Sequence, residues 1–150
     1  MSGEQDRIDI AQAAAQQLRE VGIHCTVDIP AVMDWGGQMA CLIGWGSPFD
    51  ADDHTYKVFG TDKGANYSGY SNAEVDEALT HARESSDPAV RKQYYDEFQV
   101  ALANDPAYAF ICYIDANYVA TSRLHGIDAE TVMGHHGVGI FWNVETWTLD

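Results

Sequence analysis

Positively charged residues are scarce in this sequence. Eight Lys and Arg stand against 23 Asp and Glu among its 150 residues, so the formal net charge is −15 at pH 7. A field of this sign repels the phosphates of nucleic acids and of anionic membranes. We therefore expect neither a nucleic acid nor a membrane surface as a partner.

Long apolar runs and a secretion signal are also missing. No run of about 18 apolar residues, the length that crosses a bilayer, occurs in the chain. The opening residues, MSGEQD, have neither the basic nor the apolar part of a secretion signal, so the chain by itself is typical of a cytosolic protein. With 46% apolar residues it can still form a hydrophobic core.

Cysteine is too rare and too irregularly spaced for a disulfide framework or a zinc site. Cys25, Cys41 and Cys112 are odd in number, lie far apart and form no Cys-x-x-Cys pair. Because free Cys is among the most often buried residue types, we expect three buried, inert thiols.

Hydrophobic periodicity predicts helices and strands in the order of an α/β fold. Helices are expected at residues 9–21, 54–59, 72–84 and 88–103, and strands at residues 23–29, 39–44 and 108–114. The expected end signals are Gly22 as a C-cap, Asn72 and Asp87 as N-caps, and Asp52 or Asp53 as the N-cap of the second helix. The pattern weakens from residue 123 onward.

The loop after the second predicted strand is the strongest candidate site. Ligands of α/β folds usually bind at strand ends, and here Trp45 stands between Gly44 and Gly46. The two glycines allow backbone groups to approach a ligand, and the indole supplies a flat apolar wall. A core Trp between two turn glycines is the alternative interpretation.

Other possible sites are weaker. The aspartates at positions 50, 52 and 53 do not follow the EF-hand pattern, so we expect them to cap a helix or face solvent. The pair His135-His136, considered with His125 and His54 as possible metal ligands, lacks a third ligand at a telling distance and is assigned no role. The motifs of serine hydrolases, zinc proteases and phosphate-binding glycine loops are absent from the sequence. We therefore predict a non-catalytic protein without a metal or cofactor.

Four stretches follow one another in an order that is typical of one protein family. They are LREVGI at residues 18–23, LIGWGSPFD at 42–50, YSGYSNAEVD at 67–76 and FWNVETW at 141–147. They resemble an L-x-x-x-G-I turn, a "GW" strand end with an Asp-rich loop, a Y-x-N-x-x-x-D helix start and a C-terminal aromatic segment. These features belong to the C-terminal part of the family 5 extracytoplasmic solute-binding proteins, which deliver peptides, nickel chelates and related solutes to ABC importers.

The resemblance implies an incomplete α/β lobe of a two-lobed, type II-like periplasmic-binding-protein fold. Members are several times longer, so we expect a fragment in which residues 1–122 belong to the C-terminal lobe and residues 123–150 return to the other lobe. The full-length protein is expected to be periplasmic or otherwise extracytoplasmic and to work with an ABC permease. Exposed strand edges and aromatic residues predict that the fragment forms a homo-oligomer.

The resemblance also suggests ligand contacts. Gly44, Trp45 and Gly46 match positions that, in peptide-binding members, line a side-chain pocket and pair with the peptide backbone. Those members hold the peptide's α-ammonium with an Asp, and Pro48 stands at that position here, so Asp50 is considered as its substitute.

The same comparison bears on nickel. Phe49 matches an aromatic of the nickel-type members, but a further His on which they rely has no match in this sequence. The predicted ligand-binding set is Gly44, Trp45, Gly46, Phe49 and Asp50. A peptide or peptide-like solute is the main prediction, a nickel or metal-chelate solute is the second, and a stand-alone interaction module is the third.

Overall fold

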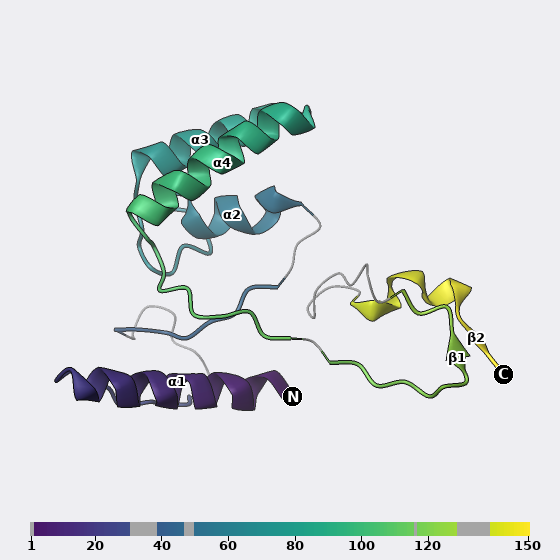
Figure 1. The fold of residues 1–150 in the computed structure, drawn as a ribbon. Helices are drawn as coiled ribbons and strands as arrows, with labels where there is room; N and C mark the ends of the chain where they lie inside the picture. The colour runs from purple at the N-terminus through teal and green to yellow at the C-terminus, as the bar shows by residue number, and fades with distance from the viewer. Residues whose placement is uncertain (1, 31–38, 47–49, 116, 129–138) are drawn as a thin grey trace. The chain divides into compact units, whose positions relative to one another are not determined.

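The computed structural model describes residues 2–30, 39–46, 50–115, 117–128 and 139–150 (Figure 1). These residues form two compact units, Met1–Gly44 and Trp45–Asp150, which are taken in turn. The predicted boundary between residues 122 and 123 concerns a fold larger than this chain and stays a prediction. None of the described helices has the length and apolar character that crossing a membrane requires.

Helix α1, Ser2–Glu20, makes up most of the first unit. It starts well before the predicted residue 9 and ends where the sequence indicates, at Gly22 with φ of +86°. The Gly22 N–H donates to the Arg19 carbonyl at 3.1 Å, and the Ile23 N–H donates to the Leu18 carbonyl at 2.9 Å. This pair of bonds satisfies two carbonyls of the last turn, so the predicted C-cap is confirmed.

Three helices form the core of the second unit (Figure 1). They are α2, Ala51–Phe59, α3, Ala73–Glu84, and α4, Pro88–Asn104. Helices α3 and α4 lie side by side, and α2 packs against α3. The buried cluster between them consists of Val75, Ala78, Leu79, Phe98, Ala101 and Leu102.

Both predicted N-caps of α3 and α4 are confirmed. The Asn72 side chain accepts from the N–H groups of Glu74 and Val75 at 3.0 and 3.2 Å. The Asp87 carboxylate accepts from the Ala89 N–H at 2.8 Å, and Pro88 occupies the first turn, where its missing N–H costs nothing. These caps act within a few residues, which is why the sequence alone predicts them.

The three predicted strands are not formed as strands here. Residues 23–29, 39–44 and 108–114 carry no strand assignment, and the only strands among the described residues are β1, Leu124–His125, and β2, Thr148–Leu149, which pair antiparallel. A strand needs a neighbour for its backbone groups, and no described segment of this chain pairs with these three. Many of their apolar side chains are accordingly exposed, among them Phe110 by 70% and Ile111 by 57%.

The prediction of buried cysteines is wrong for the same reason. Cys25, Cys41 and Cys112 are all free and exposed. Each lies in or beside one of the extended segments that lack a paired neighbour, so nothing in the described chain covers its thiol. Free cysteines are often buried because other segments usually cover the strand that carries them. The described part of this chain provides no such cover.

The tail from residue 123 is organised around one buried amide. Asn143 lies in the 3-10 helix η1, Ile140–Thr146, and its amide N–H donates to the Gly126 carbonyl at 2.8 Å. Its side-chain oxygen accepts from Trp147 Nε1 at 2.9 Å. Gly126 has φ of +88°, and a Cβ there would lie 2.9 Å from the Thr146 carbonyl oxygen, so this close approach requires glycine.

The helical core generates the first prediction. Leu79 is fully buried, and the substitution Leu79→Ala should lower the free energy of unfolding of the helical part by about 2–5 kcal/mol, because it removes transfer energy and leaves a cavity. Urea unfolding followed by circular dichroism at 222 nm measures this loss. Val100→Ala on the exposed face of α4 is the control and should change the free energy by less than about 0.5 kcal/mol.

The tail generates the second prediction. The substitution Asn143→Ala should destabilise the tail by about 1–3 kcal/mol, because the Trp147 indole N–H and the Gly126 carbonyl lose their shared partner. Hydrogen exchange of the Trp147 indole proton, observed by NMR, should become faster. Glu145→Ala, an exposed position in the same helix, should leave the exchange rate unchanged.

Candidate functional site

Trp45 is held by two aromatic side chains from different parts of the second unit. Tyr67, from the connection between α2 and α3, lies almost parallel to the indole, with 6.2 Å between ring centroids and 10° between planes. His54, from α2, lies on it at 5.7 Å and 48°. Trp45 is half-buried, so its ring is fixed by neighbours while part of it remains accessible.

Two ring nitrogens in this cluster have no hydrogen-bond partner within the part of the chain that the structure describes. They are Nε1 of Trp45 and Nδ1 of His54, and both atoms are shielded from solvent. The carboxylate nearest to the imidazole is that of Asp53, 4.0 Å from Nδ1, which is too far for a hydrogen bond. A buried polar atom without a partner is unusual in proteins and calls for an explanation.

The flanking glycines differ in their surroundings. Gly44 is exposed and ends the first unit, where an added Cβ would lie 3.0 Å from Nη2 of Arg7. Gly46 is half-buried beside Trp45 in the second unit. The close approach at Gly44 shows a packing reason for glycine, so the alternative of turn glycines around a packed Trp stays open at that position.

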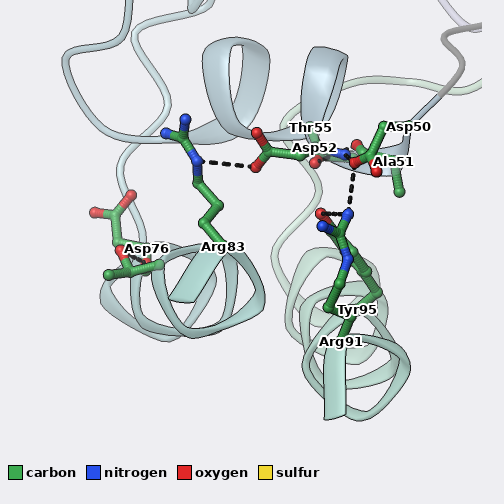
Figure 2. A network of polar contacts seen from close by, with 9 residues as sticks. Asp50, Ala51, Asp52, Thr55, Asp76, Arg83, Arg91 and Tyr95 are labelled. Carbon is green, nitrogen blue, oxygen red and sulfur yellow. Dashed lines mark hydrogen bonds and ion pairs between the residues drawn. The ribbon is translucent and has the colours of Figure 1, made fainter. Parts of the chain in front are cut away.

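Asp50 is the N-cap of α2, and the prediction of Asp52 or Asp53 for this role is wrong. The helix begins at Ala51, earlier than expected, and Asp50 has the extended backbone that a cap needs, with φ of −131° and ψ of 140°. Its carboxylate accepts from the Asp52 N–H at 2.8 Å and forms an ion pair with Arg91 of α4 at 2.5 Å (Figure 2). The Asp52 N–H and then the Arg91 guanidinium hold the pKa of the Asp50 carboxyl below its usual value.

The other two aspartates are also paired. Asp52 contacts Nε of Arg83 from α3 at 3.1 Å (Figure 2). Asp53 forms an ion pair with Lys57 at 2.9 Å, which lowers the pKa of the Asp53 carboxyl. Arg83 also stands 3.9 Å from the centroid of the Tyr56 ring. The acidic loop therefore serves to cap α2 and to attach it to α3 and α4. Among the described residues no cluster of three metal-ligating side chains occurs.

The predicted ligand residues have different surroundings in the structure, and not all of them are described. Trp45 gains two aromatic partners, whereas the carboxylate of Asp50 is engaged in a cap and an ion pair. Phe49, together with Ser47 and Pro48, lies outside the described residues, as do His135 and His136. The sequence analysis did not connect His54 or Tyr67 with Trp45, because these contacts span 9 and 22 positions and no local pattern signals them.

Comparisons with known proteins find relatives over most of the chain. It is 35% identical to protein XP55 of Streptomyces lividans over 136 residues, which cover 86% of this chain and 25% of that protein. It is 29% identical to the oligopeptide-binding protein AppA of Bacillus subtilis, over 98% of this chain and 28% of that protein. No family model matches the chain.

A solved structure is similar in fold as well as in sequence. The crystal structure of NikZ from Campylobacter jejuni in complex with Ni(L-His) superposes with a TM-score of 0.75 and 37% identity, over 93% of this chain and 30% of that one. The chain therefore spans between 25% and 30% of the length of these relatives.

Asp50 generates the third prediction. Asp50→Ala should lower the free energy of unfolding by about 1 kcal/mol through loss of the cap, and Asp50→Asn should lower it less, because an amide oxygen can still accept from the Asp52 N–H. Chemical unfolding followed by circular dichroism measures both.

The two variants should also differ in their response to acid. Because the folded pKa of Asp50 lies below its unfolded value near 3.8, its ionised form stabilises the fold above that pH, and this contribution disappears as the pH falls through the folded pKa. The loss of stability between about pH 5 and pH 2 should be smaller in Asp50→Asn than in the wild type. Equal losses would contradict the role given to the Asp50 carboxylate.

Proposed function

We propose that this chain, which belongs with the family 5 extracytoplasmic solute-binding proteins, is part of the solute-binding component of an ABC importer. The sequence relatives and the fold match support this proposal over nearly the whole chain. The predicted fold class, an incomplete α/β lobe of a periplasmic-binding-protein fold, is confirmed by the superposition on NikZ. The unpaired extended segments would then find their strand neighbours elsewhere in the complete lobe.

The proposed ligand is a peptide or peptide-like solute, bound without catalysis. Support comes from the relative AppA, an oligopeptide-binding protein, and from the Trp45 site. An aromatic ring braced by Tyr67 and His54 offers a side chain of the ligand a firm apolar surface, and the neighbouring backbone at Gly46 lacks a Cβ that would keep a ligand chain away.

A nickel chelate is the second candidate, and one observation favours it. The NikZ structure holds Ni(L-His), and its aligned part, which covers 93% of this chain, is 37% identical to it. Phe49, which the sequence analysis aligned with an aromatic of nickel-type members, keeps its place in the proposed ligand set with Gly44, Trp45 and Gly46. Asp50 is less suited to bind a solute than the sequence suggested, since its carboxylate is engaged with Asp52 and Arg91.

The remaining parts of the proposal concern the whole protein. It would act outside the inner membrane, pass its solute to an ABC permease and contain residues 1–122 of this chain in its C-terminal lobe. A homo-oligomer of the isolated chain stays a prediction, as does the role of residues 123–150 in returning to the other lobe.

The Trp45 site generates the fourth prediction. In the protein as its gene encodes it, Trp45→Ala should weaken solute binding by about 1–3 kcal/mol, because it removes the aromatic surface. Isothermal titration calorimetry with a set of tri- and tetrapeptides, and separately with Ni(L-His), measures this loss and identifies the solute class. Trp142→Ala, at a partly exposed Trp of the tail, is the matched control and should bind like the wild type.

Three results would contradict the proposal in different ways. Binding of neither solute by the wild type would remove the import function. Unchanged affinity in Trp45→Ala would remove the site. Binding of Ni(L-His) in preference to every peptide would replace the peptide by the second candidate.

A further inference from the structure

We propose that His54 is a direct ligand contact, and that its ring nitrogen and the Trp45 indole N–H together bind an oxygen acceptor of the solute, a carboxylate or a carbonyl. This inference rests on the proposed function and specifies what the site recognises. It starts from one observation: Nε1 of Trp45 and Nδ1 of His54 are both buried and, as far as the described residues extend, both lack a hydrogen-bond partner.

The two nitrogens belong to rings in direct contact. The centroids of Trp45 and His54 are 5.7 Å apart, and the planes are inclined by 48°. The proposed partner is one ligand oxygen, or one carboxylate, that bridges these neighbouring rings. A single unpaired nitrogen could be an accident of packing, but two on adjacent rings point to a common partner.

The chemistry of the two groups selects an acceptor. The indole Nε1 carries a hydrogen and can only donate, and Nδ1 of His donates when it carries the ring proton. A ligand ammonium has no acceptor to offer to the indole N–H, whereas a carboxylate accepts several hydrogen bonds. Leaving such groups unpaired destabilises the free site, and a bound acceptor would remove that cost.

The surrounding charges agree with this selection. The carboxylate best placed in the sequence to bind an ammonium, Asp50, is already engaged as a helix cap and by Arg91. Asp53, the carboxylate nearest to His54, is paired with Lys57 at 2.9 Å, which reduces its repulsion of a ligand carboxylate. The described residues of this loop therefore offer an unpaired indole N–H and an unpaired imidazole nitrogen, whereas each of the three aspartates forms an ion pair with a basic side chain.

His54 is also held firmly enough to act in recognition. It lies one turn after Asp50 in α2, and the start of that helix is attached to α4 through Asp50–Arg91 and to α3 through Asp52–Arg83 (Figure 2). A ring positioned by such a helix loses little additional entropy on binding.

The test compares two substitutions of His54 in the protein as its gene encodes it. His54→Phe keeps a ring against Trp45 but removes both nitrogens, and it should weaken peptide binding about five- to tenfold, the equivalent of one hydrogen bond. His54→Asn restores an amide N–H near the position of Nδ1 and should bind within about threefold of the wild type. His81→Phe is the matched control, since His81 lies on α3, bonded to Glu84 at 3.0 Å, and should not alter affinity.

Two further measurements need no variant of His54. An N-acetylated peptide should bind the wild type as well as the free peptide does, because the site selects an acceptor and not an ammonium. In NMR spectra of the wild type, the Trp45 indole proton and the His54 ring nitrogens should shift when peptide is added.

The outcomes separate this inference from the proposed function. If the wild type binds peptide and Trp45→Ala weakens binding, but His54→Phe binds like the wild type, the function stands and the role of His54 is refuted. Loss of binding on N-acetylation would refute the choice of an acceptor. If only Ni(L-His) binds and both His54 variants abolish it, His54 is a metal ligand and the inference is overturned. If no solute binds, the function fails and the inference fails with it.

Discussion

The packing of α3 against α4 is the contact on which the rest of the described second unit depends. Val75 and Leu79 on one helix and Phe98 on the other are almost completely buried, so the hairpin fixes the direction of every side chain on its outer faces. Two of those side chains, Arg83 and Arg91, hold the start of α2. Helix α2 in turn presents His54 to Trp45. The geometry around the indole thus depends on apolar burial in a core that contains none of the proposed ligand residues.

The basic residues of the chain are concentrated around α2. Of the eight basic residues in the chain, four lie around α2: Lys57 pairs with Asp53, Lys63 and Arg83 face the Tyr56 ring, and Arg91 pairs with Asp50. In a chain with a net charge of −15, gathering half of the cations at one acidic helix offsets local repulsion where three aspartates stand within four positions. Each pair is partly exposed and weak on its own, so their value lies in the joint attachment of α2 to two neighbouring helices.

How far the sequence predicted this structure depends on the distance over which each signal acts. Asn72, Asp87 and Gly22 were placed correctly, because a cap bonds to groups two to five residues away and its chemistry is visible locally. The strands at residues 23–29 and 108–114 have the right composition but no paired neighbour in the described chain, since pairing is a property of two segments. Trp45 was found through its glycines, whereas His54 and Tyr67 meet it only after the chain has folded.

The double engagement of Asp50 has a consequence for how such a protein can change over generations. The residue stands at the border between the segment that carries Trp45 and the helix that is fixed to the core. Substitutions at Trp45 or Gly46 leave the cap, the two arginine pairs and the buried cluster intact. Substitutions at or after Asp50 disturb α2 and with it the stable hairpin. The proposed solute site can therefore diverge at Trp45 and Gly46 without disturbing the contacts that hold α2, whereas a change at Asp50 alters them.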